Sequence, residues 1–322
     1  MQANAPVKVA VLDDFQNVAL GMADWGRLAP AAAVTVFTDN VTGDALIERL
    51  APFEVVMVIR ERTRFPREVI EKLPRLKLLI TAGMRNLAID MDACKARGII
   101  VCGTDTGSSP TAELAFGMLL ALSRNMLAED HSLRAGNWQT QRIGFGVKGL
   151  TLGVVGLGRL GAAMAGYAKA FGMDVIAWSQ NLTAERAASI GVRRVEKAEL
   201  FSTADFISLH LILSARTQGV VGAAEIAAMK PSAFLINTSR AGLLDEKALI
   251  AALTAKRIAG AALDVFETEP LPADAAIIRA PNTLLTPHLG YATADSFTFY
   301  FPHAVEDIEA WLAGKPVRVL TA

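Results

Sequence analysis

The sequence predicts two doubly wound α/β domains, each built on a parallel β-sheet. Short β-branched runs alternate with longer amphipathic segments along the 322 residues, which is typical of strand–helix–strand units. A glycine-rich turn follows one apolar run of strand type near the middle of the chain. In the C-terminal half, an arginine, a glutamate and a histidine each follow another such run, so we expect all three at one edge of the second sheet.

Five apolar runs near the N-terminus are expected to be the strands of the first domain. They span residues 7–12, 34–37, 55–59, 76–81 and 99–101. The intervening segments have the apolar spacing of helices, for example residues 67–72 and 91–97. Residues 104–110 form a loop by composition, and a long helix is expected from Thr111 to about Arg134.

A second series of strands begins at Thr151. It continues with apolar runs at residues 175–178, 206–209, 234–237, 259–265 and 283–286. A last helix is expected at about residues 296–312, and it could pack back on the first domain. The predicted division is therefore a substrate domain at residues 1–104 and 292–322, with a nucleotide-binding domain at residues 105–291.

Composition indicates an ordinary globular enzyme. The chain is 52% hydrophobic, enough to bury a large core, and its 32 Lys and Arg balance 32 Asp and Glu. Because no basic surplus exists, we expect no nucleic-acid partner. The N-terminus has no charged-then-apolar signal pattern and the apolar runs are too short to span a bilayer, so we expect no membrane partner and a cytoplasmic location.

Cysteine and histidine usage gives no indication of a metal site. Cys94 and Cys102 are the two cysteines, and they form no C-x-x-C motif. The four histidines have no paired spacing either. We therefore expect two small buried thiols and no metal.

The glycine motif is formed by Gly156, Gly158 and Gly161. The first glycine would permit a tight turn, the second would let a pyrophosphate approach the backbone, and the third would bring helix and strand together. A lone G-x-G-x-x-G is weak evidence. Here it lies between a run of strand type and an alanine-rich helix, which favours a dinucleotide site over a merely tight turn.

The choice between NAD and NADP stays open. The strand that follows the motif should end at the residue that contacts the adenosine ribose, and an acidic side chain there would select NAD. This chain has Ser179 instead, followed by Gln180 and Asn181. Arg186 is too far along the chain to bind a 2′-phosphate with ease.

Several motifs, in order and at near-family spacing, resemble the D-isomer-specific 2-hydroxyacid dehydrogenases. They cover nearly the whole chain and comprise residues 156–161, 208–210, 229–231, 237–241, 262–270, 286–290 and 314–316. The resemblance implies a flavodoxin-like substrate domain and a Rossmann domain around a cleft. It also implies a homodimer, and reversible reduction of a small 2-keto acid to a 2-hydroxy acid by NADH or NADPH.

The resemblance assigns three catalytic residues. Arg240 would bind the substrate carboxylate and the keto oxygen, because a planar guanidinium offers paired donors. His288 would deliver a proton to that oxygen as hydride reaches the carbon. Glu269 would hold the imidazole in one orientation and favour its charged form.

It also assigns residues to the cofactor. Besides the glycines and Ser179, these are Arg159, Leu160, His210, Thr238, Ser239, Asp264 and Gly290. Asp264 would contact the nicotinamide carboxamide, although it could instead cap or pair locally. His210 would lie near the adenosine half of the cofactor.

The substrate loop departs from the family pattern. Relatives have G-x-G-x-D-N-I-D where this chain has Gly83, Met84 and Arg85 followed by Asn-Leu-Ala-Ile-Asp. Arg85 could present its backbone amide to the substrate carboxylate, add a cation for a second anionic group, or simply face solvent. Arg60 raises the same question, because its surroundings resemble those in phosphoglycerate dehydrogenases. The physiological acid is not determined by the sequence.

Two alternatives of function remain. Transcriptional corepressors share this fold and the catalytic set, so a dinucleotide-sensing binding protein is possible, although the chain has no disordered interaction tail. Another Rossmann enzyme, such as an amino-acid dehydrogenase, would need ammonia. Trp138 could anchor a subunit contact or be buried in its own domain.

Overall fold

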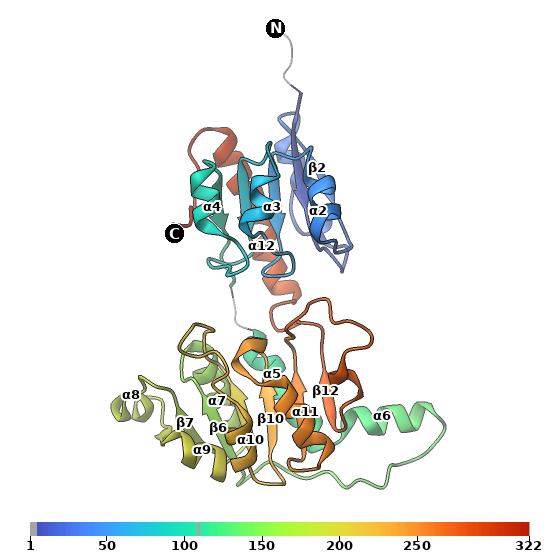
Figure 1. Ribbon diagram of the computed structural model, residues 1–322, viewed down its shortest axis with the longest axis vertical. Helices are drawn as coiled ribbons and strands as arrows, with labels where there is room; N and C mark the ends of the chain where they lie inside the picture. The colour runs from blue at the N-terminus through green and yellow to red at the C-terminus, as the bar shows by residue number, and fades with distance from the viewer. Residues whose placement is uncertain (1–4, 108–109, 322) are drawn as a thin grey trace. The chain divides into compact units, whose positions relative to one another are not determined.

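The computed structural model describes residues 5–107 and 110–321, and its backbone divides into two compact units (Figure 1). The first unit comprises Met1–Ser108 and Ala292–Ala322, and the second comprises Ser109–Tyr291. Each unit has its own parallel sheet. Residues 108 and 109 of the expected loop lie outside the described part of the chain.

Five parallel strands form the sheet of the first unit in the order β2-β1-β3-β4-β5. Their bounds are Val7–Val11 (β1), Ala32–Val36 (β2), Val55–Val58 (β3), Leu78–Thr81 (β4) and Ile100–Gly103 (β5). Every residue of β3 and β4 is buried, as expected for central strands covered on both faces. The order reverses between β1 and β3, so the carboxyl ends of these strands form the topological switch point of the sheet.

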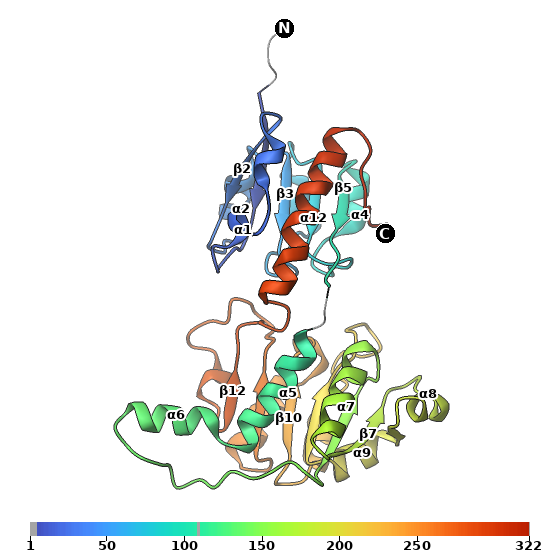
Figure 2. The ribbon, with the colours of Figure 1, turned by 180° about the vertical axis from the view of Figure 1, so that it is seen from behind.

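Helices cover both faces of this sheet (Figures 1 and 2). One face carries Gly43–Leu50 (α2), Arg67–Glu71 (α3) and Met91–Ala96 (α4). The other carries Ala19–Met22 (α1), the short 3-10 helix Trp25–Leu28 (η1) and Ala294–Leu312 (α12). The buried residues of α12 include Phe297, Phe301, Val305 and Ile308, which recur at helical spacing and form one apolar stripe.

Seven parallel strands form the sheet of the second unit in the order β12-β11-β10-β9-β6-β7-β8. Their bounds are Thr151–Val155 (β6), Asp174–Trp178 (β7), Arg193–Arg194 (β8), Phe206–Leu209 (β9), Phe234–Asn237 (β10), Gly260–Leu263 (β11) and Thr283–Leu285 (β12). This is the Rossmann order with one further strand, and its switch point lies between β6 and β9. The sequence prediction of two doubly wound domains is confirmed.

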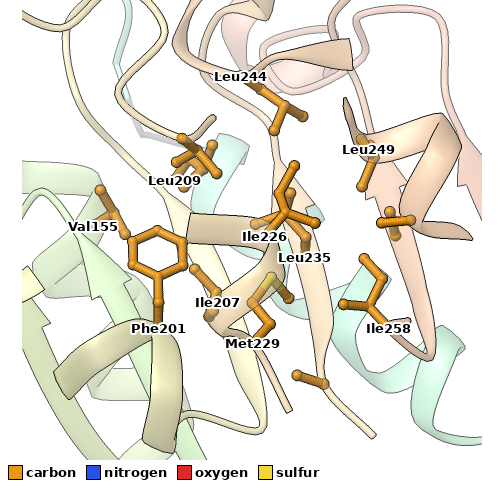
Figure 3. Packing of buried hydrophobic residues seen from close by; sticks show 14 of the residues in the cluster. Val155, Phe201, Ile207, Leu209, Ile226, Met229, Leu235, Leu244, Leu249 and Ile258 are labelled. Atoms are coloured by element: carbon orange, nitrogen blue, oxygen red, sulfur yellow. The ribbon is translucent and has the colours of Figure 1, made fainter. Parts of the chain in front are cut away.

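Two apolar layers hold the helices of this unit on its sheet. On one face are Lys197–Thr203 (α9), Ala223–Ala228 (α10) and Glu246–Thr254 (α11), and their core side chains meet those of β9 and β10 (Figure 3). In that view Phe201, Ile226 and Leu249 surround Ile207 and Leu235. On the other face are Pro110–Ser123 (α5) and Arg159–Ala170 (α7). The remaining short elements are Ala184–Ala188 (α8), Ala241–Leu243 (η2) and Ala276–Arg279 (η3).

The expected long helix from Thr111 to Arg134 is wrong in one respect. The chain forms two helices there, α5 at Pro110–Ser123 and α6 at Met126–Arg134. The break falls at Asn125, whose φ of 52° is left-handed, and asparagine tolerates that region better than most residues. The break lets α6 extend away from the sheet of its unit, and none of its residues is buried (Figures 1 and 2).

The C-terminal segment of the first unit pairs with the edge strand β5. Gly103 N donates to Arg318 O at 3.0 Å, and Leu320 N donates to Val101 O at 2.8 Å. Arg318 also reaches α12, where its Nε donates to Asp307 Oδ1 at 3.0 Å. Burial raises the pKa of Asp307 to about 7, although Arg318 acts in the opposite direction. Among the described residues, no helix combines the length and apolar composition needed to cross a bilayer.

Candidate active site

Three neighbouring parallel strands end at one edge of the second sheet, and each is followed by one expected catalytic residue. In the register of these strands, Asn237 of β10 lies opposite Leu263 of β11, which lies opposite Leu285 of β12. Arg240 follows β10, Glu269 follows β11 and His288 follows β12. The carboxyl edge of a doubly wound sheet is where such folds bind ligands.

His288 and Glu269 are in direct contact. His288 Nδ1 lies 2.6 Å from Glu269 Oε2, and because a carboxylate only accepts, Nδ1 is the donor. The second oxygen, Glu269 Oε1, accepts from Phe266 N at 2.8 Å, which fixes the carboxylate. His288 has a φ of 53°, so its backbone is held in the left-handed conformation that few non-glycine residues adopt. With Nδ1 engaged, Nε2 is the atom available for proton transfer.

Arg240 lies in a turn whose residues hydrogen-bond to one another. Asn237 Nδ2 donates to Arg240 O at 3.0 Å, and Ser239 N donates to Asn237 Oδ1 at 3.0 Å. Ser239 Oγ donates to Leu209 O at 2.7 Å and so ties this turn to the end of β9. Arg240 Nη1 donates to Ser239 O at 2.7 Å. The buried asparagine therefore sets the path of the backbone on which the guanidinium is carried.

Asp264 is fully buried and serves the loop that carries His288. Its Oδ1 accepts from Thr286 Oγ1 at 2.5 Å and from Leu289 N at 2.7 Å, and its Oδ2 accepts from Gly290 N at 2.8 Å. Burial raises the pKa of Asp264, while these hydrogen bonds and His288 lower it. The local role left open by the sequence is the one seen here, and a contact with nicotinamide stays a prediction.

The three glycines of the motif have distinct surroundings. A Cβ at Gly161 would lie 2.0 Å from Gly156 O, so the first turn of α7 packs directly on the strand-end turn. Gly156 has a φ of 101°, which favours glycine, and a Cβ there would lie 2.8 Å from the carbonyl carbon of His210. A Cβ at Gly158 would meet nothing within 4 Å. Open space therefore lies before the N-terminus of the 12-residue helix α7, where the backbone favours an anion.

Two buried polar atoms near this turn have no hydrogen-bond partner among the described residues, His210 Nδ1 and Thr238 Oγ1. His210 follows β9 and Thr238 follows β10, on the same side of the switch point. The other nitrogen of the imidazole, Nε2, lies 2.8 Å from Ser208 Oγ. Burial lowers the pKa of His210 to about 4, so its ring is neutral at physiological pH. Unmet buried polar groups carry a cost that a polar ligand would remove, and the site fits a dinucleotide.

The other expected cofactor residues differ in exposure, from the exposed Arg159 to the buried Gly290. Ser179 is half-buried directly after β7, and Arg159 is exposed at the start of α7 beside the half-buried Leu160. Gly290 is already engaged at both backbone groups, because its N donates to Asp264 and its O accepts from Thr111 Oγ1 at 2.8 Å. Contact of these four residues with a cofactor stays a prediction.

The expected substrate residues lie together in the first unit. Arg60 follows β3 with a φ of 55°, and a Cβ at Gly83 would lie 2.2 Å from Arg60 Nη1, so the guanidinium lies on this glycine. Met84 and Arg85 are exposed on the loop after β4. Asn86, which the sequence analysis did not select, is buried and donates from Nδ2 to Arg60 O at 2.7 Å. The loop thus fixes the backbone of Arg60.

Other supporting residues were given no role by the sequence analysis. Thr286 and Thr111 hold the His288 loop through Asp264 and Gly290. The ring of Tyr291 stands edge-on to the imidazole of His288, with the ring centres 5.4 Å apart. Threonine and tyrosine occur throughout such chains, and only the fold brings these to the site.

Comparison with known proteins gives one consistent family. Residues 116–290 match the model of the "D-isomer specific 2-hydroxyacid dehydrogenase, NAD binding domain". A D-3-phosphoglycerate dehydrogenase of Methanocaldococcus jannaschii is 38% identical over 312 residues, which are 96% of this chain and 58% of that protein. This chain therefore spans little more than half the length of that relative.

Two further proteins match over most of their length. A glyoxylate reductase of Thermococcus litoralis is 37% identical over 260 residues, or 78% of each chain. The crystal structure of a protein from Ralstonia solanacearum, described as a putative D-3-phosphoglycerate dehydrogenase, superposes with a TM-score of 0.92. It is 35% identical, and the match covers 97% of this chain and 96% of that one.

Proposed function

Because the chain belongs to the D-isomer-specific 2-hydroxyacid dehydrogenase family, we propose that it interconverts a small 2-keto acid and its 2-hydroxy acid with NAD(P). The observation that carries the proposal is the contact between His288 Nδ1 and Glu269 Oε2 at 2.6 Å, at the sheet edge that also carries Arg240. An imidazole oriented by a carboxylate is suited to move a proton, and a guanidinium at the same sheet edge is suited to bind a carboxylate.

The second unit would hold the dinucleotide at its switch point. Gly156, Gly158 and Gly161 would bring the backbone and the N-terminus of α7 to the pyrophosphate. His210 and Thr238 would satisfy their buried polar atoms on the same ligand. When bound, the reduced dinucleotide supplies the hydride that reaches C2 of the keto acid.

The chain's own residues would complete the reduction. The Arg240 guanidinium binds the substrate carboxylate and polarises the keto oxygen. As the C2 carbonyl becomes an alcohol, His288 donates the proton from Nε2 to the oxygen and is left neutral. Glu269 keeps the ring oriented through Nδ1, so that Nε2 faces the substrate oxygen.

The substrate is proposed to be glyoxylate, hydroxypyruvate or a phosphorylated acid of the 3-phosphoglycerate type. The named relatives include a glyoxylate reductase and a D-3-phosphoglycerate dehydrogenase. Arg60 and Arg85 are cations of the first unit that suit an anionic substrate. Ser179 carries no charge to repel a 2′-phosphate, so use of both NADH and NADPH is expected.

Steady-state kinetics tests this proposal. The protein is assayed with glyoxylate, hydroxypyruvate and 3-phosphohydroxypyruvate, using NADH or NADPH, with and without ammonium. Turnover without ammonium is the expected result, and turnover only with ammonium would indicate an amino-acid dehydrogenase. Cofactor binding without any oxidation would indicate a sensor on the same fold.

A homodimer in the cytoplasm completes the proposal. On α6 and the segment after it, large apolar side chains face solvent, including Trp138 at 81% and Ile143 at 94% exposure. An apolar patch on a segment that extends from its unit is typical of a subunit interface, here with a second copy of the chain. Light scattering should give twice the monomer mass of 34.3 kDa, and Trp138→Glu should reduce it.

A further inference from the structure

The switch point of the first sheet is built differently from that of the second. Asp13 lies just beyond β1, and residues 60–63 lie just beyond β3, so both lie at the carboxyl ends where the strand order reverses. Sheets with this strand order bind ligands at that point. Asp13 has a φ of 60° and Arg60 a φ of 55°, both left-handed. Non-glycine residues keep such conformations only where their surroundings impose them.

The side chain of Asp13 joins the two strand ends. Thr63 Oγ1 donates to Asp13 Oδ2 at 2.7 Å, and Asn40 Nδ2 donates to Asp13 Oδ1 at 2.7 Å. Asn40 Nδ2 also lies 3.1 Å from Thr63 Oγ1, which closes a ring of three polar groups. Asp13 is 1% exposed and Thr63 is 2% exposed. We call these three residues the Asp13 network.

The network reaches both arginines of the segment. Arg62 Nη1 donates to Asp13 O at 2.6 Å, and the Arg62 guanidinium lies 4.9 Å from the centre of the Phe15 ring. At the other end, Asn86 Nδ2 holds Arg60 O at 2.7 Å. The four residues from Arg60 to Thr63 are therefore held from two sides, and the directions of the two guanidinium groups follow from this backbone.

Burial makes the aspartate costly to keep. It raises the pKa of Asp13, while the hydrogen bonds from Asn40 and Thr63 and the charge of Arg62 lower it. A buried carboxylate that only filled space could be replaced by apolar groups at little cost in stability. Its neighbour Asp14 has a local role instead. Asp14 accepts from Val18 N at 3.1 Å and from Ala19 N at 2.8 Å at the start of α1, and so joins no distant segment through these bonds.

We propose that Asp13 is a positioning residue for substrate recognition, which acts through Thr63 and Asn40 to fix the segment that carries Arg60 and Arg62. This inference rests on the proposed function, because it assigns that segment to the acidic substrate. Loss of the network leaves the arginines in place but frees their backbone. Substrate affinity falls, while cofactor affinity, which belongs to the second unit, is unaffected.

Two matched pairs of variants test the inference. Thr63→Val removes the hydroxyl with little change of shape, and Thr63→Ser keeps the hydroxyl. Asp13→Asn keeps the left-handed conformation within reach but removes the charge and one acceptor. Asp14→Asn makes the same chemical change at the neighbouring carboxylate. For each, KM of the best 2-keto acid, kcat, the Kd of NADH and the melting temperature are measured.

Thr63→Val and Asp13→Asn should raise KM for the keto acid roughly tenfold. Each leaves a buried polar group without its partner, and such a loss amounts to about a factor of ten in an equilibrium constant. The Kd of NADH should be unchanged, because the residues proposed to bind the cofactor belong to the second unit. Thr63→Ser should restore KM, and Asp14→Asn should lower the melting temperature without changing KM. If Thr63→Val does not fold, Asp13→Asn and Thr63→Ser still carry the comparison.

An unchanged KM in folded Thr63→Val and Asp13→Asn would overturn the inference and leave the proposed function intact. Equal changes in KM and in the Kd of NADH would also overturn it, because they would indicate a general loss of structure. Absence of keto-acid turnover by the unaltered protein would overturn the proposed function, and this inference with it.

Discussion

The two units use the same sheet architecture but build their switch points by opposite means. In the second unit, glycines leave open space at Gly158, and the buried atoms His210 Nδ1 and Thr238 Oγ1 have no partner among the described residues. In the first unit, Asp13, Asn40 and Thr63 fill the corresponding place and satisfy one another. The second has open space beside the backbone at Gly158, which we call the crevice, and the first is a segment held by side chains.

The two switch points are suited to different ligands. A backbone crevice with unmet polar atoms suits a large ligand of fixed shape, such as a dinucleotide. A side-chain network suits the positioning of a few charged groups around a small acid. Substitutions in the second unit should therefore change the chemical step and cofactor binding, and those in the first should change substrate affinity or stability.

The largest expected effect is that of His288→Gln in the second unit. Glutamine keeps a polar group but cannot donate a proton as an acid, so kcat for keto-acid reduction should fall about a thousandfold or more. The Kd of NADH, followed by fluorescence titration, should change little. Preserved turnover with weakened NADH binding would contradict this assignment.

Arg240→Lys should have the next largest effect. A lysine cannot reproduce the paired donors of the guanidinium, and loss of one such donor to a developing oxyanion costs about 2–4 kcal/mol in kcat/KM. Kinetics with the best keto acid checks this value. A kcat/KM close to that of the unaltered protein would exclude Arg240 from the reaction.

Three glycine substitutions on or beside α7 sharpen the account of the crevice. Gly161→Ala should lower both the melting temperature and NADH affinity, because its Cβ would lie 2.0 Å from Gly156 O. Gly158→Ala should weaken NADH binding alone, since its Cβ enters open space at the expected pyrophosphate site. Gly166→Ala, which also meets nothing within 4 Å, is the control and should be neutral or stabilise by about 0.5–1 kcal/mol. Equal NADH binding by the Gly158 and Gly166 variants would refute the crevice.

The smallest effect on activity is expected for Asp307→Asn in the first unit. The folded pKa of about 7 lies above the ordinary 3.8, so the protonated form contributes stability at low pH that is lost as the pH rises through about 7. Relative to the unaltered protein, the variant should gain up to about 2.5 kcal/mol of unfolding free energy between pH 5 and pH 8, because each pH unit between 5 and the folded pKa is worth about 1.4 kcal/mol. Denaturant titration at both pH values measures this. If the difference in unfolding free energy between the variant and the unaltered protein is the same at both pH values, the pKa of Asp307 is not raised.

Local features of the fold could be predicted from the sequence. Apolar runs such as residues 206–209 and 234–237 are strands as predicted, because a buried parallel strand needs an unbroken apolar run. The glycine turn lies between a strand and a helix, β6 and α7, as predicted. The prediction of one long helix is wrong at Asn125, because a single left-handed residue leaves the apolar spacing on either side unchanged.

Contacts between distant segments were beyond the sequence. Asp13 and Thr63 are 50 positions apart, and Asp264 meets Gly290 across 26. Asp13 and Thr63 were assigned no role from the sequence, and the motifs that contain Asp264 and Gly290 assign both to the cofactor and not to each other. The contact of His288 with Glu269 was expected only through the family resemblance, and the strand register explains how adjacent strands make it possible.

The decisive measurement is kcat for keto-acid reduction in Glu269→Gln, together with the Kd of NADH. His288 is held to deliver the proton from Nε2 because the Glu269 carboxylate orients the ring through Nδ1. A glutamine amide can turn its NH2 group toward Nδ1 and then no longer selects the ring orientation needed for the transfer, so kcat should fall about a hundredfold or more while the Kd of NADH is unchanged. A kcat equal to that of the unaltered protein would contradict this role and would make the contact purely structural.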